Sequence, residues 1–113
     1  MSQRMRRVNA ILKEAIAEEV ADLKDPRLGF VTVTGVDTAP NLRHATVFYA
    51  VIGSDDEQRD TAEGLRAAAP RISRNIGSQI RMKYTPSLHF EVDESIERGA
   101  RIADLLRHID EEE

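Results

Sequence analysis

The apolar residues in the first quarter of the chain recur with the spacing of an amphipathic helix. They follow an i, i+3, i+4, i+7 rhythm: Met5, Val8, Ile11, Leu12, Ala15, Ile16 and Leu23. Charged residues take most of the remaining positions. Pro26 ends the pattern, because the residue before a proline is disfavoured in the helical region. Asp25-Pro26-Arg27-Leu28 has the composition of a β turn, so we expect a helix followed by this turn.

Three later segments alternate apolar and polar residues and predict β-strands. They cover residues 30–36, 44–52 and 84–92, and Pro86 marks the start of the third. The connection between the first two is short and contains Pro40 and Asn41, which favours an antiparallel hairpin. Phe48 and Tyr49 fall on opposite faces of the second strand. We therefore expect one of these two rings to lie in the core.

A long helical segment separates the second and third predicted strands. Ser54 can cap it, and the acids Asp55, Asp56 and Glu57 suit its first turn. Pro70 interrupts the segment and is also suited to the first position of a new helix. The sequence thus predicts a helix to about Ala69, a kink at Ala68-Ala69-Pro70, and a second arm.

A last helix is expected after the third strand, capped by Ser95 and running to Ile109. Residues 110–113 are too acidic to pack and form a tail that we expect to be disordered. The predicted order is α-β-β-α-kink-α-β-α, with helices covering one face of a three-stranded sheet. This is an α+β fold in one domain, residues 1–109, and the length leaves no room for a second core.

Cationic residues are concentrated in two segments although the net charge is −4. Residues 1–13 and 66–83 hold nine of the 16 Lys and Arg and no acid. A basic face of this kind attracts phosphate even on an acidic protein; the alternative is that both segments are simply solvated faces. The candidate RNA contacts are Arg4, Arg6, Arg7, Lys13, Arg71, Arg74, Arg81 and Lys83. Lys24 and Arg27 are weaker candidates, because the Asp-Pro-Arg turn also has a structural explanation.

The residues that carry enzyme chemistry are missing or scattered. There is no cysteine, and His44, His89 and His108 lack metal-ligand spacing. Neither a phosphate loop nor a nucleophile elbow is present. Asp93 and Glu97 are one helical turn apart and could pair as carboxylates, but helix capping and the preference for acids in a first helical turn explain them. We expect no enzyme activity, cofactor, metal or small-molecule substrate. No apolar run is long enough to span a bilayer, so we expect a cytoplasmic protein with no membrane partner.

Three motifs give the chain its family resemblance. They are Lys24-Asp25-Pro26-Arg27-Leu28-Gly29-Phe30-Val31-Thr32-Val33-Thr34, then Ala45-Thr46-Val47-Phe48-Tyr49, then Pro86-x-Leu88-x-Phe90-x-x-Asp93-x-Ser95. In this order, from Arg4 to about Leu106, the chain resembles the ribosome-binding factor A family. The resemblance implies a type II KH-like (K-homology) domain without the Gly-x-x-Gly loop of ordinary members. The six glycines indeed never fall three apart. Where the family has an Ala-x-Gly kink, this chain has Ala68-Ala69-Pro70.

The resemblance also implies the function. It predicts a monomeric ribosome assembly factor that binds the free small (30S) subunit and its 16S rRNA. Such a factor promotes late maturation, including 5′-end rRNA processing, matters most in the cold, and leaves before translation. Two alternatives remain open from the residues: a module that docks on a ribosomal or assembly protein without RNA readout, and a small nuclease built on scattered carboxylates.

Overall fold

The computed structural model describes residues 2–95 of the 113-residue chain. Along the chain it has α1 (Gln3–Ala21), β1 (Phe30–Thr38), β2 (His44–Ile52), α2 (Asp55–Gln79) and β3 (Ser87–Val92). This confirms the predicted α+β order through the third strand. The predicted last helix and the acidic tail lie outside the described residues beyond Ser95.

Helix α1 begins and ends through local hydrogen bonds. The Ser2 hydroxyl accepts from the Met5 N–H at 3.1 Å, an N-cap. The helix ends at Ala21, five residues before Pro26, so the end predicted from the proline is too late. The Leu23 N–H donates to the Val20 carbonyl at 3.2 Å, which tightens the last turn before the chain leaves the helix.

The sheet has the order β1-β2-β3, with β2 in the middle. β1 and β2 pair antiparallel, which confirms the predicted hairpin, and β2 and β3 pair parallel. A parallel pair needs a long crossover, and α2 supplies it. A β-bulge between Val33 and Gly35 shifts the register of β1. β3 begins at Ser87 and not at Tyr84, because Pro86 has no N–H to donate to a neighbouring strand.

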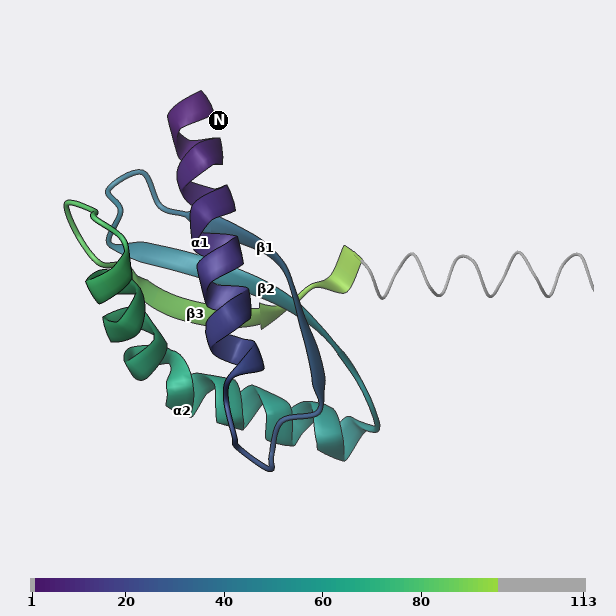
Figure 1. Cartoon of the computed structure of the whole chain (residues 1–113). Coiled ribbons are helices and arrows are strands. Elements are labelled where there is room, and N and C mark those ends of the chain that lie inside the picture. Colours follow the sequence, from purple (N-terminus) through teal and green to yellow (C-terminus); the bar gives the residue numbers. More distant parts are fainter. Residues whose placement is uncertain (1, 96–113) are drawn as a thin grey trace, which may run out of the picture.

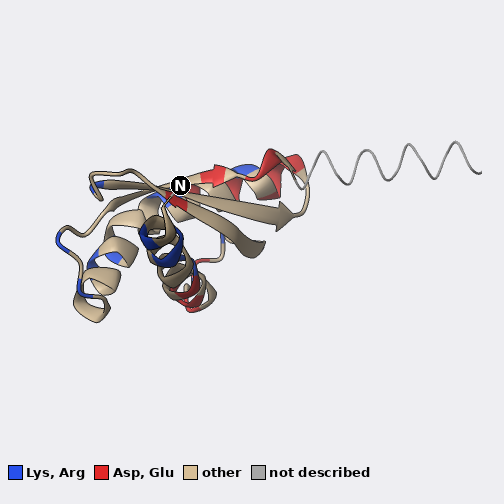
Figure 2. Ribbon diagram, turned by 90° about the horizontal axis from the view of Figure 1, so that it is seen from above, with Lys and Arg blue, Asp and Glu red and all other residues tan. Residues whose placement is uncertain are grey.

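Both helices cover the same face of the sheet (Figures 1 and 2). The core between them contains Leu12 and Ile16 of α1, Val47 and Tyr49 of β2, and Leu65, Ile72 and Ile76 of α2. Tyr49 is thus the core ring predicted from the sequence, while Phe48 is half-buried on the opposite face. That opposite face is open at one end, where Phe30 is 84% and Ile52 80% exposed.

Helix α2 begins with a reciprocal cap. The Glu57 N–H donates to the Ser54 hydroxyl, and the Glu57 carboxylate accepts from the Ser54 N–H, both at 3.2 Å. The helix continues through Pro70 to Gln79 without a break. Its ribbon nevertheless changes direction near its middle (Figure 1), so α2 has two arms within one helix. We call the arm after Pro70 the C-terminal arm.

The chain leaves β3 through a turn centred on Asp93. Glu94 and Ser95 are already helical, and Asp93 Oδ1 accepts from the Ser95 N–H at 3.0 Å. The prediction that Ser95 is the cap is therefore wrong. Asp93 takes that position, because a carboxylate can accept the N–H two residues on. Asp93 Oδ2 also accepts from the Thr34 hydroxyl at 2.6 Å, which joins the β1 bulge to the end of β3.

Candidate nucleic-acid interface

The four cationic candidates on α1 are all exposed. Leu12 and Ile16 mark the buried side of the helix. At about 100° of rotation per residue, Arg7 points away from the core, while Arg4 lies on one flank and Arg6 and Lys13 on the other. These side chains therefore fan around the exposed half of α1 and do not share one line.

The other four candidates lie on and just after the C-terminal arm of α2. Arg71, Arg74, Arg81 and Lys83 are exposed. The arm is fixed against α1 by Glu19, whose carboxylate accepts from the Asn75 amide at 2.9 Å and from the Gln79 amide at 3.2 Å. Asn75 thus positions two helices and does not simply line an exposed face.

Charge is distributed unevenly over the domain. In Figure 2 most Lys and Arg positions lie on the side that carries the start of α1, the C-terminal arm and the neighbouring loops. Most Asp and Glu positions lie at the opposite end and along the second half of α1. Within residues 2–95, the ion pairs are Arg27–Asp25 and Arg59–Asp56. None of the eight candidates is neutralised by a carboxylate there, so their charges remain available to a ligand.

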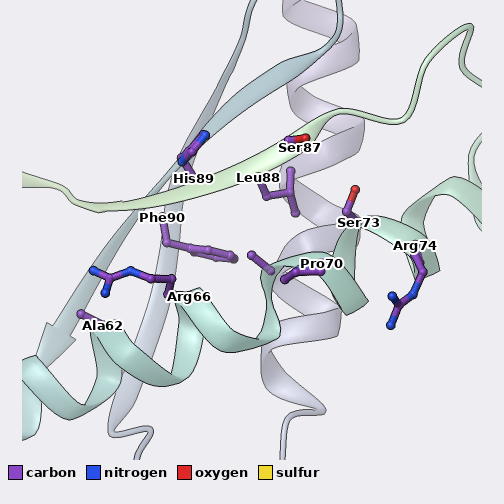
Figure 3. Close-up of a pocket in the computed structure, with 10 residues that line it drawn as sticks. Ala62, Arg66, Pro70, Ser73, Arg74, Ser87, Leu88, His89 and Phe90 are labelled. Carbon is purple, nitrogen blue, oxygen red and sulfur yellow. The ribbon is translucent and has the colours of Figure 1, made fainter.

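A groove of about 660 Å³ separates α2 from β3 (Figure 3). Arg66, Pro70 and Arg74 line it from the helix, and His89 and Phe90 line it from the strand. Arg66 and Arg74 lie about two helical turns apart along it. Sequence reasoning placed Arg66 in the basic segment but not among the contacts. The groove has no sequence signal, because it depends on how α2 packs against β3.

Two of the three predicted kink residues, Ala69 and Pro70, line this groove, while Ala68 lines the hollow against the Asp25-Pro26 turn. Ala69 is buried, Ala68 is half-buried, and Pro70 is exposed to the groove. Pro70 has no N–H, so the Arg66 carbonyl receives no hydrogen bond from the helix position four residues on. The bend and the groove therefore occur at the same point of α2.

The surface beside Arg71 has mixed charge. Arg71 and Lys24 line a hollow of about 300 Å³ together with Glu19 and Asp22. The same two cations border a second hollow of about 400 Å³ against the Asp25-Pro26 turn. Arg71 therefore has acidic residues beside it, whereas the groove that Arg74 lines contains none among the described residues.

The Asp25-Pro26-Arg27 turn holds itself together. The Leu28 N–H donates to the Asp25 carbonyl at 3.1 Å, which closes a β turn. The Arg27 guanidinium donates to Asp25 Oδ2 at 2.7 Å, and the Arg27 N–H donates to Oδ1 at 2.9 Å. The hydrogen bonds from Arg27 lower the pKa of the Asp25 carboxyl. Arg27 thus has a structural role in this turn.

The contact between one cation and one aromatic ring was not predicted from the sequence. The Arg43 guanidinium carbon lies over the Tyr84 ring, 4.2 Å from its centroid, and Lys83 Nζ lies 5.6 Å from the same centroid. Arg43 belongs to the β1–β2 loop and Tyr84 to the α2–β3 loop. The sequence holds no sign of this contact, because the pairing of β2 with β3 brings the two loops together.

The structure also brings together two histidines that are distant in sequence. The rings of His44 and His89 are 6.3 Å apart, centroid to centroid, on neighbouring strands. Within residues 2–95, no three His, Cys, Asp or Glu side chains form a group that would hold a metal ion. No helix of that part of the chain is long and apolar enough to cross a bilayer.

These features define the class of protein. The α-β-β-α-β order, the mixed three-stranded sheet and the bent α2 without a Gly-x-x-Gly loop are those of a type II KH-like domain. The chain belongs to the ribosome-binding factor A family, whose sequence profile matches residues 4–106.

Curated relatives agree over nearly the whole chain. Ribosome-binding factor A of Rubrobacter xylanophilus is 50% identical over 111 residues, which cover 97% of this chain and 90% of the relative. The Halothermothrix orenii protein of that name is 44% identical, with 98% of this chain and 92% of the relative covered.

Solved structures give the same family. The crystal structure of ribosome-binding factor A from Thermus thermophilus superimposes with a TM-score of 0.71 at 27% identity, covering 78% of this chain and 94% of that chain. A homology model of the Thermus thermophilus factor, fitted into a cryo-EM map of its complex with the 30S subunit, gives a TM-score of 0.63 at 28% identity. It covers 76% of this chain and 91% of that chain.

Proposed function

We propose that this protein binds the free small ribosomal subunit through its 16S rRNA and supports late steps of subunit assembly without catalysing a reaction. The observation that carries the proposal is family membership over residues 4–106, joined to a relative fitted in a 30S complex. The exposed cations without carboxylate partners in the described structure supply the physical means.

The proposed binding surface has two parts. The first is the start of α1 with Arg4, Arg6, Arg7 and Lys13. The second is the C-terminal arm and the following loop, with Arg71, Arg74, Arg81 and Lys83, bordered by the groove between α2 and β3. Phosphate contacts would supply most of the affinity, and the shape of the bent helix and groove most of the selectivity.

Binding alone is sufficient for such a role. Misfolded RNA helices are long-lived, especially at low temperature, and a protein that binds one arrangement more tightly shifts the population towards it. We infer that the protein acts in this way as a cytoplasmic monomer, that it favours the arrangement from which the 5′ end of 16S rRNA is matured, and that it matters most in the cold. It would dissociate before translation.

The salt dependence of binding tests the proposal. If about five phosphates are neutralised, the logarithm of the association constant for the small subunit falls against the logarithm of salt concentration with a slope near −4. Wild-type protein and purified subunits would be measured at four or more salt concentrations. Binding with a slope near zero would contradict RNA binding and favour docking on a protein.

That protein-docking alternative has one observation of its own. Phe30 and Ile52 are paired across β1 and β2 and remain exposed on the open face of the sheet.

The nuclease alternative is tested by incubating pure protein with precursor 16S rRNA and magnesium. We expect no cleavage, and cleavage that follows the protein through purification would overturn the proposal.

A further inference from the structure

The β1–β2 loop and the α2–β3 loop meet at one end of the domain and place a cation on an aromatic ring. The Arg43 guanidinium carbon lies 4.2 Å from the Tyr84 ring centroid. Tyr84 is 37% exposed, and Arg43 and Lys83 are exposed. Lys83 Nζ lies 5.6 Å from the same centroid. We call Arg43 and Tyr84 together the stacking pair.

The loop that carries Arg43 is held by backbone hydrogen bonds. The Leu42 N–H donates to the Ala39 carbonyl and the Ala39 N–H to the His44 carbonyl, both at 2.8 Å. The Arg43 N–H donates to Asn41 Oδ1 at 3.0 Å. Leu42 has a positive φ of 63°, a conformation that L residues rarely adopt and that these bonds maintain. Arg43 is therefore presented from a fixed backbone.

The loop that carries Tyr84 is anchored on both sides. The Ser87 N–H donates to the Arg43 carbonyl at 2.8 Å, which ties the two loops together. The carbonyl of buried Pro86 accepts from the Ser73 hydroxyl at 2.7 Å. Thr85 lies against Gly77, where an added Cβ would come within 2.6 Å of Thr85 Oγ1. The ring of Tyr84 is thus offered on a loop with little freedom to move.

The charge around the stacking pair suits a polyanion. Residues 39–43 and 80–86 contain Arg43, Arg81 and Lys83 and no Asp or Glu. A contact that served only to join the loops would need neither an exposed ring nor a second cation, Lys83, near that ring. A guanidinium on an aromatic ring presents flat π surfaces on which nucleobases stack, and a lysine beside it suits the adjoining phosphate.

We propose that the stacking pair binds one unpaired nucleobase and that Lys83 binds the phosphate next to it. This deepens the proposed function and rests on it: the partner at this end of the domain is a single-stranded or bulged RNA nucleotide, not a continuous duplex. Bases within a duplex are already stacked on their neighbours and do not reach the pair. The stacking pair would add a preference for unpaired RNA that phosphate contacts alone cannot supply.

Fluorescence tests the base contact directly. The chain has no tryptophan and only two tyrosines, of which Tyr49 is buried, so Tyr84→Trp places a single indole at the pair. We expect its emission to be quenched by hexa-adenylate and not by an abasic ribose-phosphate oligomer of equal length and charge. Equal quenching by the two oligomers, or none by either, would overturn the proposal.

Affinity for the small subunit tests its importance. We expect Tyr84→Leu to weaken binding roughly 5- to 150-fold, the cost of one lost base stack, without changing the salt slope. Tyr84→Phe keeps the ring and should bind like wild type. Arg43→Lys keeps the charge but loses the planar group and should be weakened. Wild-type affinity in Tyr84→Leu, or equal weakening in Tyr84→Phe, would show that the ring has no stacking role.

The two proposals fail in distinguishable ways. If wild-type protein binds the subunit with a steep salt slope while Tyr84→Leu binds equally well, only the stacking pair is wrong. If wild-type binding has no salt slope, the RNA-binding function is wrong. The thermal unfolding midpoints of all the variants would be compared with wild type, so that a loss of folding is not read as a loss of contact.

Discussion

The side-chain oxygen of Asn9 accepts a hydrogen bond from the backbone N–H of Thr38 at 3.0 Å. Both residues are buried, with 8% and 4% of their surface exposed. The bond joins the second turn of α1 to the last residue of β1. It thereby fixes how the start of α1 sits on the sheet, and with it the directions in which the α1 cations point.

We expect Asn9→Leu to destabilise the fold. The Thr38 N–H would remain buried without this acceptor, which costs about 1–3 kcal/mol. Urea unfolding followed by circular dichroism measures the change. Gln79→Leu is the matched control, because it removes an amide that donates to Glu19 at the exposed end of α2. The control should stay within about 0.5 kcal/mol of wild type. Equal midpoints for Asn9→Leu and wild type would contradict a structural role for this bond.

Reversing two charges on the C-terminal arm tests the binding surface. Arg71→Glu combined with Arg74→Glu should leave the fold intact, because exposed substitutions rarely change stability by more than about 0.5 kcal/mol. It should abolish binding to the small subunit, since it both removes two phosphate contacts and adds repulsion. Equilibrium binding at one low salt concentration is sufficient to see the loss.

A matched control for this reversal lies on the other arm of α2. Arg59 is exposed and pairs with Asp56 at 3.3 Å, within the acidic end of the helix. Arg59→Glu changes the charge per residue equally but away from the proposed surface, so binding should be nearly retained. Equal losses per reversed charge in the two variants would indicate a response to net charge alone and would remove the C-terminal arm from the site.

The Asp25–Arg27 pair predicts that the stability of the fold depends slightly on pH in the acid range. Hydrogen bonds from Arg27 hold the pKa of Asp25 below its ordinary 3.8. A carboxyl with a lowered pKa in the folded state stabilises the fold above its ordinary pKa, and this contribution disappears as pH falls through the lowered value. The stability difference between wild type and Asp25→Asn should be constant above about pH 5 and shrink below about pH 4. A difference independent of pH would contradict the ionised pair.

Most of the fold follows from local patterns in the sequence. Alternation gives the strands, the 3.6-residue rhythm gives α1, and Ser54 with Glu57 gives the start of α2. Boundaries that depend on distant partners were missed. The start of β3 at Ser87 is set by the Arg43 carbonyl, and the cap at Asp93 coincides with a bond to Thr34 in β1. Such bonds between distant residues leave no periodic signal.

The candidate site also has a part that the sequence predicts and a part that depends on the folded structure. Exposure of the arginines on α1 and α2 follows from helix periodicity, because Leu12 and Ile72 mark the buried sides. The groove between α2 and β3 and the contact of Arg43 with Tyr84 arise only when strands pair and helices pack. They join positions far apart in the chain, so one sequence without its fold cannot reveal them.

Replacing Pro70 with glycine tests what the bend in α2 requires. Pro70→Gly restores the family's Ala-x-Gly pattern and returns an N–H that can donate to the Arg66 carbonyl. That hydrogen bond contributes about 0.5–1.5 kcal/mol. Glycine also gives the unfolded chain more freedom, which costs about 0.5–1 kcal/mol. The two effects oppose each other, so the unfolding free energy should change by less than about 1 kcal/mol.

Binding by Pro70→Gly should equal or exceed that of wild type. Glycine permits a close approach of RNA to the backbone where the proline ring now lines the groove. Pro70→Ala is the informative companion, because alanine favours a regular helix and fills the same wall with a methyl group. If the bend positions Arg66 and Arg74 along the groove, Pro70→Ala should stabilise the helix yet weaken subunit binding. A large loss of binding in Pro70→Gly would instead mean that the proline ring itself contacts the partner.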